Sequence, residues 1–219
     1  PLKNEHVASI WREIMSACLA LEAPQRVAVL GPQGTFCEQA AIEFFGSAAN
    51  LIYCANFDEV FHATAAGTAQ YGVVGMENST EGVVARSLDL FLRSPVHVVG
   101  EVSLQVRFNL LRQLNSDAGI EVVMAHPQAL GQCRHYLRAK GITPIAYADT
   151  AAAAAFVADG DDLGASAVAP PIAAELYGLH MIEHGIEDDD RNTTRFVVLS
   201  RDAAAPDQGA GQLMTTFIF

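Results

Sequence analysis

The amino-acid sequence predicts an α/β protein with two lobes, each built around a mostly parallel sheet. Short apolar runs of strand length alternate with stretches of helical periodicity between residues 26 and 200, and such alternation is typical of α/β layers. The alternation falls into two sets, with a crossing expected near residues 101–103 and a return near residues 186–192. With 51% hydrophobic and 17% charged residues, the composition is that of a globular protein with a real core.

The first predicted element is a helix that precedes the alternating pattern. Asn4 is placed as its N-cap and Pro24 ends it, since the residue before a proline disfavours the helical conformation. Its apolar side chains recur at helical spacing at Val7, Ile10, Trp11, Ile14, Met15, Cys18 and Leu19. The partners of this stripe must come from elsewhere in the complete protein or from another chain.

The first set of strands and helices begins directly after Pro24. Asn56 is expected to cap one of its helices, with Glu59 three residues later completing a capping box. The strands are predicted at residues 27–30, 51–54 and 71–76. One helix is predicted at residues 36–45, a second begins after Asn56, and a third follows the turn at residues 77–82 and ends at residue 92.

After residue 92 the pattern continues to residue 199. Pro170 and Pro171 open one of its helices, because proline suits a first turn. Strands are predicted near residues 96–100, 105–111, 122–125, 165–168 and 195–199, and helices near residues 129–140, from Thr150 and from Pro170. Residues 201–212 have the composition of a linker, and residues 213–219 are predicted to begin a new strand.

Composition excludes several classes of function. The formal charge of −12 and the lack of Lys/Arg clusters argue against nucleic-acid or anionic-membrane partners. The four cysteines are scattered without a C-x-x-C pair, which argues against zinc sites and disulfide scaffolds and favours reduced thiols. Neither an export signal nor a membrane span is recognisable. The sequence therefore predicts a cytoplasmic protein without membrane association.

Three polar segments directly follow or precede apolar strands, where open α/β sheets build ligand sites. Residues 31–35 contain two glycines and the start of a helix, and such amides suit an anion; the alternative is a tight turn. Residues 77–82 form a polar turn whose variety of side chains favours a site as much as a solvated turn. In residues 192–196, Arg195 is a candidate carboxylate clamp, or else a surface ion-pair partner.

Four motifs resemble the prephenate dehydratase family in their expected order. They are G-P-Q-G-T-F at residues 31–36, E-N-S-T-E-G at 77–82, H-P-Q-A-L-G-Q-C at 126–133 and N-T-T-R-F at 192–196. The Ala-rich segment after Thr150 and residues 173–179 also match that family. The resemblance extends over about residues 26–200, and four ordered motifs make it specific.

The resemblance implies a two-lobed, periplasmic-binding-protein-like (type II) α/β fold with a cleft between the lobes, preceded by one isolated helix. It also implies a homodimer, with truncation of the complete protein at both ends. Its implied domains are the last helix of a chorismate mutase domain at 1–23, a first lobe at 26–102 with 190–200, a second lobe at 103–189, and a linker with the first ACT-domain strand at 201–219.

The activity implied by the resemblance is the decarboxylating dehydration of prephenate to phenylpyruvate, CO₂ and water in L-phenylalanine biosynthesis. This hydro-lyase reaction requires no metal, redox cofactor or covalent nucleophile, so no cofactor is expected. Two alternatives stay open: an arogenate dehydratase that shares these motifs, and a non-catalytic module that binds aromatic acids.

The resemblance also implies roles for individual residues. Thr194 is the candidate that hydrogen-bonds the leaving hydroxyl, with Asn78 and Gln132 beside it in the catalytic set. Gln132 as an exposed helix residue and His126 as a turn residue are the alternatives. The acidic residues 187–190 are expected to form a solvated loop. The residues expected to bind substrate are Arg195, Thr35, Gly34, Glu77, Ser79, Thr80, His126 and Thr150.

Overall fold

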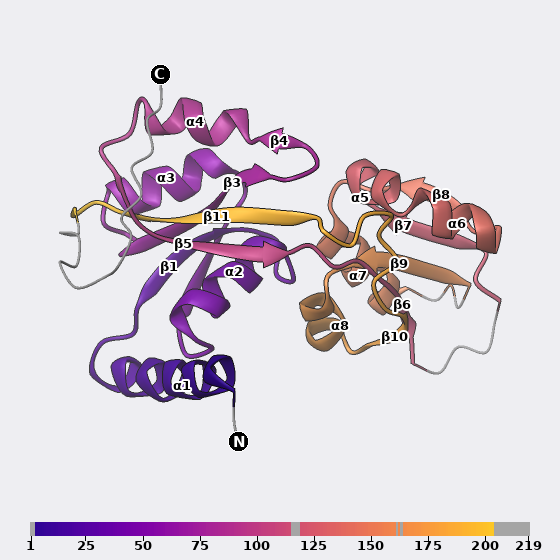
Figure 1. The fold of residues 1–219 in the computed structure, drawn as a ribbon, viewed down its shortest axis with the longest axis horizontal. Coiled ribbons are helices and arrows are strands. Elements are labelled where there is room, and N and C mark those ends of the chain that lie inside the picture. The colour runs from indigo at the N-terminus through magenta and orange to yellow at the C-terminus, as the bar shows by residue number, and fades with distance from the viewer. Residues whose placement is uncertain (1–2, 115–118, 161, 163, 204–219) are drawn as a thin grey trace. The chain divides into compact units, whose positions relative to one another are not determined.

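The protein folds as two compact units (Figure 1). The computed structural model describes residues 3–114, 119–160, 162 and 164–203. Among these, unit 1 comprises residues 3–30, 40–104 and 194–203, and unit 2 comprises residues 31–39 together with the described part of 105–193. The predicted strand at residues 213–219 and most of the predicted linker lie outside the described residues.

The short segment at residues 31–39 belongs to unit 2, whereas the sequence analysis assigned it to the first lobe. Its contacts explain the difference. The ring of Phe36 meets the ring of Phe108 edge-on, with 5.5 Å between the centroids. The hydroxyl of Tyr177 donates a hydrogen bond of 2.8 Å to the carbonyl oxygen of Gln33. The predicted motif at residues 31–36 is therefore anchored on unit 2.

The described strands of unit 1 form a six-stranded sheet in the order β2-β1-β3-β11-β5, with the short β4 paired to β3. The bounds of these strands are β1 Arg26–Leu30, β2 Asn50–Cys54, β3 Tyr71–Asn78, β4 Gly82–Val83, β5 His97–Gln105 and β11 Thr193–Ser200. The helices are α1 Asn4–Glu22, α2 Phe36–Phe45, α3 Phe57–Ala65 and α4 Ala85–Phe91. The boundary between the units falls inside α2.

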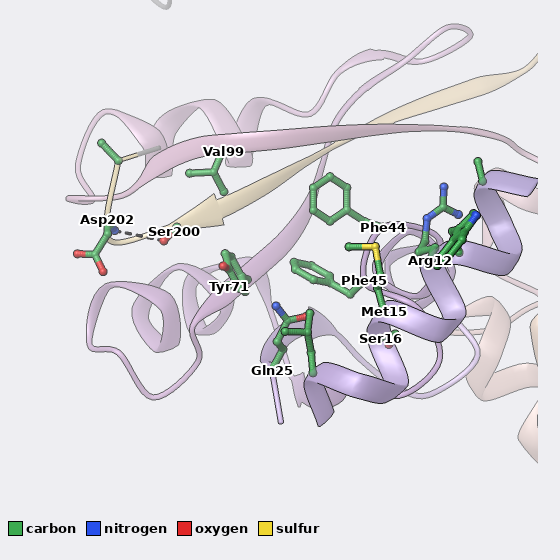
Figure 2. A pocket seen from close by; sticks show the side chains of 14 residues that line it. Arg12, Met15, Ser16, Gln25, Phe44, Phe45, Tyr71, Val99, Ser200 and Asp202 are labelled. Carbon is green, nitrogen blue, oxygen red and sulfur yellow. Dashed lines mark hydrogen bonds between the residues drawn. The ribbon is translucent and has the colours of Figure 1, made fainter. Parts of the chain in front are cut away.

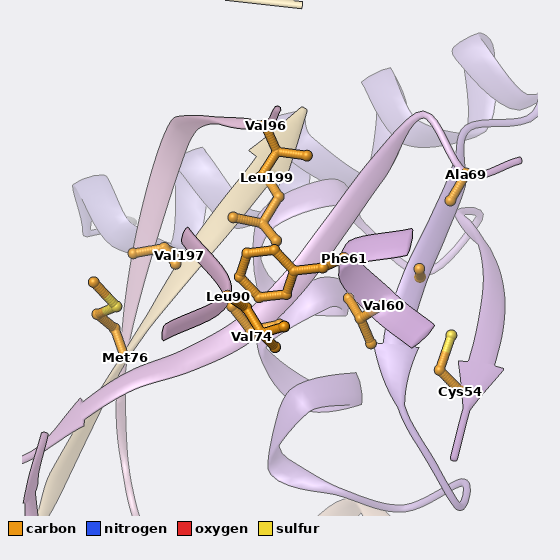
Figure 3. Packing of buried hydrophobic residues seen from close by; sticks show 11 residues of the cluster. Cys54, Val60, Phe61, Ala69, Val74, Met76, Leu90, Val96, Val197 and Leu199 are labelled. Atoms are coloured by element: carbon orange, nitrogen blue, oxygen red, sulfur yellow. The ribbon is translucent and has the colours of Figure 1, made fainter. Parts of the chain in front are cut away.

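The main core of unit 1 lies between one face of the sheet and helices α3 and α4. Figure 3 shows Phe61 at its centre, with Val60, Val74 and Leu199 around it. Phe61 is 1% exposed, and its ring lies edge-on to that of Phe91 at 5.0 Å. Alternate residues of β3 and β11 point to this face because side chains of a strand alternate between the two faces.

The predicted N-cap residue is correct for helix α3 of unit 1 and wrong for helix α1. The side chain of Asn56 caps α3 by accepting a hydrogen bond of 2.9 Å from the amide of Glu59, as predicted. Asn4 is instead the first helical residue of α1, whose N-cap is Lys3 without a side-chain cap bond. The N-cap prediction for Asn4 is therefore wrong by one position, which is the usual uncertainty of a helix end.

Helix α1 contacts the rest of unit 1 through polar side chains. Ser16 is buried, and Arg12 forms an ion pair of 3.0 Å with Glu43 of α2. Glu13 accepts a hydrogen bond of 3.2 Å from the amide of Ser47. The predicted apolar stripe remains largely exposed at Val7, Ile10, Trp11, Ile14, Met15 and Leu19.

The described strands of unit 2 form a five-stranded sheet in the order β10-β6-β9-β7-β8. Its strands are β6 Asn109–Gln113, β7 Val122–Ala125, β8 Thr143–Ala146, β9 Ala165–Ala169 and β10 Leu179–Glu183. Its helices, besides the first turn of α2, are α5 Pro127–Gln132, α6 Arg134–Lys140, α7 Thr150–Asp159 and α8 Pro171–Tyr177. The predicted helix at residues 129–140 is thus two helices, and β4, β8 and β10 were not predicted.

The sheet of unit 2 is covered on both faces. Leu110 packs in the cluster formed with α5 and α6, whereas its neighbour Leu111 packs in the cluster formed with α7 and α8. Val168 and Ala167 divide between the same two clusters. The alanines of α7 are small enough for the helix to lie close to the sheet, which explains the Ala-rich segment after Thr150.

Both sheets are mixed, so the prediction of mostly parallel sheets is wrong. Strand β1 runs parallel to β2 and β3, but β11 runs antiparallel to β3. In unit 2, β7 is parallel to β8 and β9, while β6 is antiparallel to β9 and β10. Residues 193–200 look like any other buried apolar strand in sequence, and the direction of such a strand has no local signal.

The expectation that the acidic residues 187–190 form a solvated loop is wrong for Glu187, while residues 188–190 are exposed. The side chain of Glu187 is 1% exposed and forms an ion pair of 2.5 Å with Arg107. It also accepts a hydrogen bond of 2.9 Å from the amide of Phe108. Asp188 pairs with His135 at the start of α6 at 2.9 Å. Glu187 and Asp188 therefore connect separate segments of unit 2, whereas Asp189 and Asp190 are exposed.

Replacing Glu187 with alanine is expected to destabilise the protein by about 3 kcal/mol, because it leaves a buried amide and a guanidinium without their acceptor. Urea unfolding followed by circular dichroism measures this loss. The matched control is Asp190→Ala, an exposed neighbour in the same run, which is expected to change the free energy of unfolding by less than about 0.5 kcal/mol. Equal losses in the two variants would contradict the structural role of Glu187.

Candidate functional site

Two strands of unit 1 bring Asn78 and Thr194 together. Asn78 ends β3, Thr194 lies near the start of β11, and the two are register partners in the antiparallel pair. The side-chain amide of Asn78 donates a hydrogen bond of 2.8 Å to the hydroxyl oxygen of Thr194. This bond uses an acceptor position of the hydroxyl, so its own proton takes no part in the bond.

The orientation of the Asn78 amide is fixed by the turn that follows it. Its oxygen accepts hydrogen bonds of 3.0 Å from the amides of Thr80 and Glu81, which is the Asx-type turn that asparagine favours. Gly82 closes the turn at φ +83, where a side chain would be strained. Ser79 and Thr80 are exposed in this turn. The polar segment is therefore a connector that orients the donor aimed at Thr194.

Arg195 lies between two carboxylates of unit 1. Its terminal nitrogen Nη2 is 3.4 Å from Oε2 of Glu77 on β3, and Nη1 is 3.5 Å from Oε2 of Glu101 on β5. The register between β3 and β11 shifts between Arg195 and Phe196, and such a bulge redirects the side chains next to it. Arg195 thus has two ion-pair partners within the sheet of unit 1, and its role as a carboxylate clamp stays a prediction.

The first turn of α2 holds its own carboxylate. The amide of Gly34 donates a hydrogen bond of 2.6 Å to Oε2 of Glu38, and the amide of Glu38 donates to the hydroxyl of Thr35 at 3.3 Å. Thr35 and Glu38 are both buried. The amide expected to receive a substrate anion is therefore occupied by an internal anion, at the helix end that favours negative charge.

Tyr177 of α8 closes over this turn within unit 2. Burial first, and then the Glu38 carboxylate, raise the pKa of Tyr177, so its phenol stays protonated near neutral pH. The proton is the one donated to the carbonyl oxygen of Gln33. A methyl group at Gly34 would lie 3.3 Å from Ala173 of the same helix, which explains the glycine at this close approach.

Three further predicted residues lie at helix ends of unit 2. His126 is the N-cap of α5, and its Nδ1 accepts a hydrogen bond of 3.3 Å from the amide of Gln128. Gln132 ends the same helix, and its Oε1 accepts a hydrogen bond of 3.0 Å from the side chain of the buried Asn192. Thr150 is the first residue of α7. His126 therefore has the turn-stabilising contact that was its alternative, whereas Gln132 is half-buried and held.

A cavity of about 650 Å³ in unit 1 lies away from these residues. Figure 2 shows Phe44, Phe45 and Tyr71 on one side of it and Met15 of α1 on the other. Of the described residues that line it, none is a predicted site residue. It is the space between α1 and the sheet face opposite the main core.

Within residues 3–203, leaving aside their gaps, no group of three or more His, Cys, Asp and Glu side chains is arranged to hold a metal ion. No helix in the described part of the chain is both long and apolar enough to cross a membrane.

The structure brings some of the predicted site residues into contact and shows contact partners that were not predicted. Unit 1 brings the neighbours Glu77 and Asn78 together with the neighbours Thr194 and Arg195. The two pairs are far apart in sequence. The partners that the sequence analysis missed are Glu38, Glu101 and Asn192. Asn192 lies inside a recognised motif, so the motif could have indicated it. Glu101 lies within an apolar strand and has no local signal.

Comparison with known proteins identifies the family. The family model described as "PDT: Prephenate dehydratase" matches residues 27–204, which is most of the chain. The chain belongs to the prephenate dehydratase family. The resemblance carried by the four motifs is thereby confirmed.

Relatives of this dehydratase family include bifunctional proteins. A bifunctional chorismate mutase/prephenate dehydratase of Neisseria gonorrhoeae is 47% identical over 202 residues, which cover 91% of this chain and 56% of that protein. Arogenate dehydratase 2 of Petunia hybrida is 39% identical over 184 residues, covering 83% of this chain and 46% of its own length. The chain thus spans about half the length of these curated relatives.

Solved structures of similar proteins share the two-unit α/β fold, which confirms the predicted fold class. A prephenate dehydratase from Arthrobacter aurescens in complex with L-Phe has a TM-score of 0.75 at 28% identity, covering 84% of this chain and 62% of its own. GqqA, described as a novel type of quorum quenching acylase, has a TM-score of 0.76 at 30% identity, covering 85% and 68%.

Removing the carboxylate of Glu38 tests the role of this internal anion. Glu38→Ala leaves the Gly34 amide without its acceptor, and we expect a loss of about 1–3 kcal/mol in the free energy of unfolding. Glu59→Ala is the matched control, because Glu59 accepts a hydrogen bond at the exposed start of α3 and its removal is expected to cost about 0.5 kcal/mol. Thermal or urea unfolding of both variants compares them; a smaller loss for Glu38 than for Glu59 contradicts this account.

Proposed function

We propose that this chain catalyses the decarboxylating dehydration of prephenate to phenylpyruvate, CO₂ and water. Membership of the prephenate dehydratase family supports the proposal. The observation that carries it is the hydrogen bond from Asn78 to Thr194, which holds a hydroxyl in a fixed direction with its proton outside that bond. The reaction needs such a donor at the departing ring hydroxyl.

The proposed reaction requires the protein to bind prephenate and to assist the departure of its ring hydroxyl. Prephenate carries a carboxylate on a quaternary ring carbon and a hydroxyl on the opposite ring carbon. The carbon–carboxylate bond breaks, its electron pair enters the ring, the carbon–hydroxyl bond breaks, and the departing hydroxide takes up a proton to leave as water. The ring becomes aromatic, which drives the reaction. Thr194 is proposed to hydrogen-bond the departing oxygen as negative charge develops on it.

Arg195 is proposed to bind the pyruvyl carboxylate of the substrate. Strong pairing with the carboxylate that leaves as neutral CO₂ would stabilise the ground state and oppose the reaction. The guanidinium has five N–H groups in a planar fork, so contacts with Glu77 and Glu101 leave donors for a further carboxylate. Contacts of Gly34, Thr35, Ser79, Thr80, His126, Gln132 and Thr150 with substrate remain predictions of the sequence.

Arogenate dehydration is the second candidate function. Arogenate carries an ammonium group where prephenate carries a keto group, and the carboxylates of Glu77 and Glu101 beside Arg195 would suit a positive charge. An acylase reaction is less well supported, because an activated nucleophile needs an adjacent base. The hydrogen-bond partner of Thr194 is the amide of Asn78, which is not a base.

Helix α1 is proposed to belong to a chorismate mutase segment of a longer, homodimeric protein. The support is the name of the bifunctional relatives together with the exposed apolar side chains of α1, among them Ile10, Trp11 and Met15. The domain limits inferred from the sequence, with the first helix separate from both lobes, are part of this proposal.

Replacing Thr194 with valine removes the hydroxyl with little change in volume. We expect turnover of prephenate to fall by about 10²–10⁴-fold, whereas Thr194→Ser should retain most of the activity because it keeps the donor. Phenylpyruvate formation, followed by absorbance in alkali, measures both. Thr193→Ala is the neighbouring control and is expected to stay within about threefold of the parent. Unchanged turnover in Thr194→Val would remove Thr194 from the mechanism.

A direct comparison of substrates separates the two candidate functions. We expect kcat/KM for prephenate to exceed that for arogenate by at least about tenfold, roughly the effect of one charged contact. The reverse order would establish arogenate as the substrate. Binding of prephenate without turnover of either compound would instead indicate a module that only binds aromatic acids.

A further inference from the structure

Arg195 is flanked by a carboxylate from each neighbouring strand. Glu77 lies opposite Arg195 in the β3–β11 pair, and Glu101 comes from β5 on the other side of β11. The two contacts use different terminal nitrogens, at 3.4 Å for Nη2 and 3.5 Å for Nη1. The Arg195 side chain is 27% exposed, less than Glu77 at 52% and Glu101 at 48%.

We propose that Glu101 is a positioning residue for the reaction, which acts by orienting the guanidinium of Arg195. The inference rests on the proposed function, in which Arg195 receives the pyruvyl carboxylate. A guanidinium held at one nitrogen still turns about its side-chain torsions, whereas one held at two nitrogens has its plane fixed. A fixed plane directs the remaining N–H groups, and bidentate binding of a carboxylate depends on that direction.

The strand that carries Glu101 is itself held in place next to this residue. A methyl group at Gly100 would lie 2.6 Å from the ring of Phe44, so the glycine lets that ring of α2 pack on β5. Glu101 and Phe44 also line a common hollow of about 430 Å³ with Arg12 and Glu43. The position of Glu101 is therefore set by packing as well as by its ion pair.

Orientation and charge make opposite predictions when Glu101 is changed. Two carboxylates beside one guanidinium give a formal local charge of −1, which repels an anionic substrate at long range. If Glu101 acted only through its charge, its loss would tighten substrate binding in every variant. If it acts by orientation, glutamine, which keeps the length and an acceptor oxygen, should preserve binding, and alanine should weaken it.

The test measures KM and kcat for prephenate in the parent chain, Glu101→Gln and Glu101→Ala. We expect Glu101→Ala to raise KM by about tenfold with kcat within about threefold, because a misdirected clamp weakens substrate binding. Glu101→Gln should stay within about threefold of the parent. Glu43→Ala is the matched control: it removes a carboxylate from the same hollow, where Glu43 pairs with Arg12, and should leave KM unchanged.

A double-mutant cycle shows whether Glu101 acts through Arg195. In the Arg195→Ala background, Glu101→Ala should have no further effect on KM, because coupled residues are non-additive. An unchanged or lowered KM in Glu101→Ala, or the same rise with and without Arg195, would overturn the proposal.

A readout without turnover separates this proposal from the proposed function. If the parent chain makes no phenylpyruvate, the proposed function fails, and the guanidinium N–H signals of Arg195 in ¹⁵N NMR still test the orientation. Arg195→Lys assigns these signals. We expect hindered rotation in the parent and in Glu101→Gln, and faster rotation in Glu101→Ala. If the Arg195 guanidinium rotates equally fast in the parent and in Glu101→Ala, the positioning role is refuted, independently of the activity measured.

Discussion

The insertion of β11 between β3 and β5 is the constraint on which the candidate residues of unit 1 depend. This strand arrives late in the chain and runs antiparallel to β3, so that Thr194 meets Asn78 and Arg195 meets Glu77. The same inner position places Arg195 next to Glu101 on the other side. If β11 lay at the edge of the sheet beside β3, Arg195 would keep Glu77 and lose Glu101. Apolar residues of β11, such as Leu199 in the main core, supply the burial that holds it there.

The chain has a large net negative charge, and individual carboxylates have different local roles. A formal charge of −12 opposes the approach of an anionic substrate, and the carboxylates of Glu77 and Glu101 strengthen that opposition at Arg195. If Arg195 binds the substrate as proposed, attraction comes from directed N–H groups at short range rather than from a broad positive field. Other acidic side chains serve the fold instead: Glu187 is buried against Arg107, and Glu38 occupies the amide of Gly34.

The sequence was sufficient for the fold class, most elements and the family, because these rest on periodicity and on contiguous motifs. Capping by Asn56 and the Pro-led start of α8 followed from local chemistry. The direction of β11, the exposed strand β8 and the assignment of residues 31–39 to unit 2 depend on contacts distant in sequence. The contact of Glu101 with Arg195 could not be predicted either, because the two residues are far apart in the chain. Predicting the pairing of Asn78 with Thr194 would have required the register between β3 and β11.

The role proposed for Thr194 has to allow for the weakness of a threonine hydroxyl as an acid. Such a hydroxyl cannot deliver a proton readily near neutral pH, so its benefit comes from a hydrogen bond already aimed at the departing oxygen. That benefit is lost if the side chain must first be ordered. Asn78 and Thr194 both lie within strands, and the amide that fixes Thr194 is itself fixed by two backbone donors in the turn after β3. The proposed reaction is driven by aromatisation, so it needs little more than this orientation and does not depend on a strong acid.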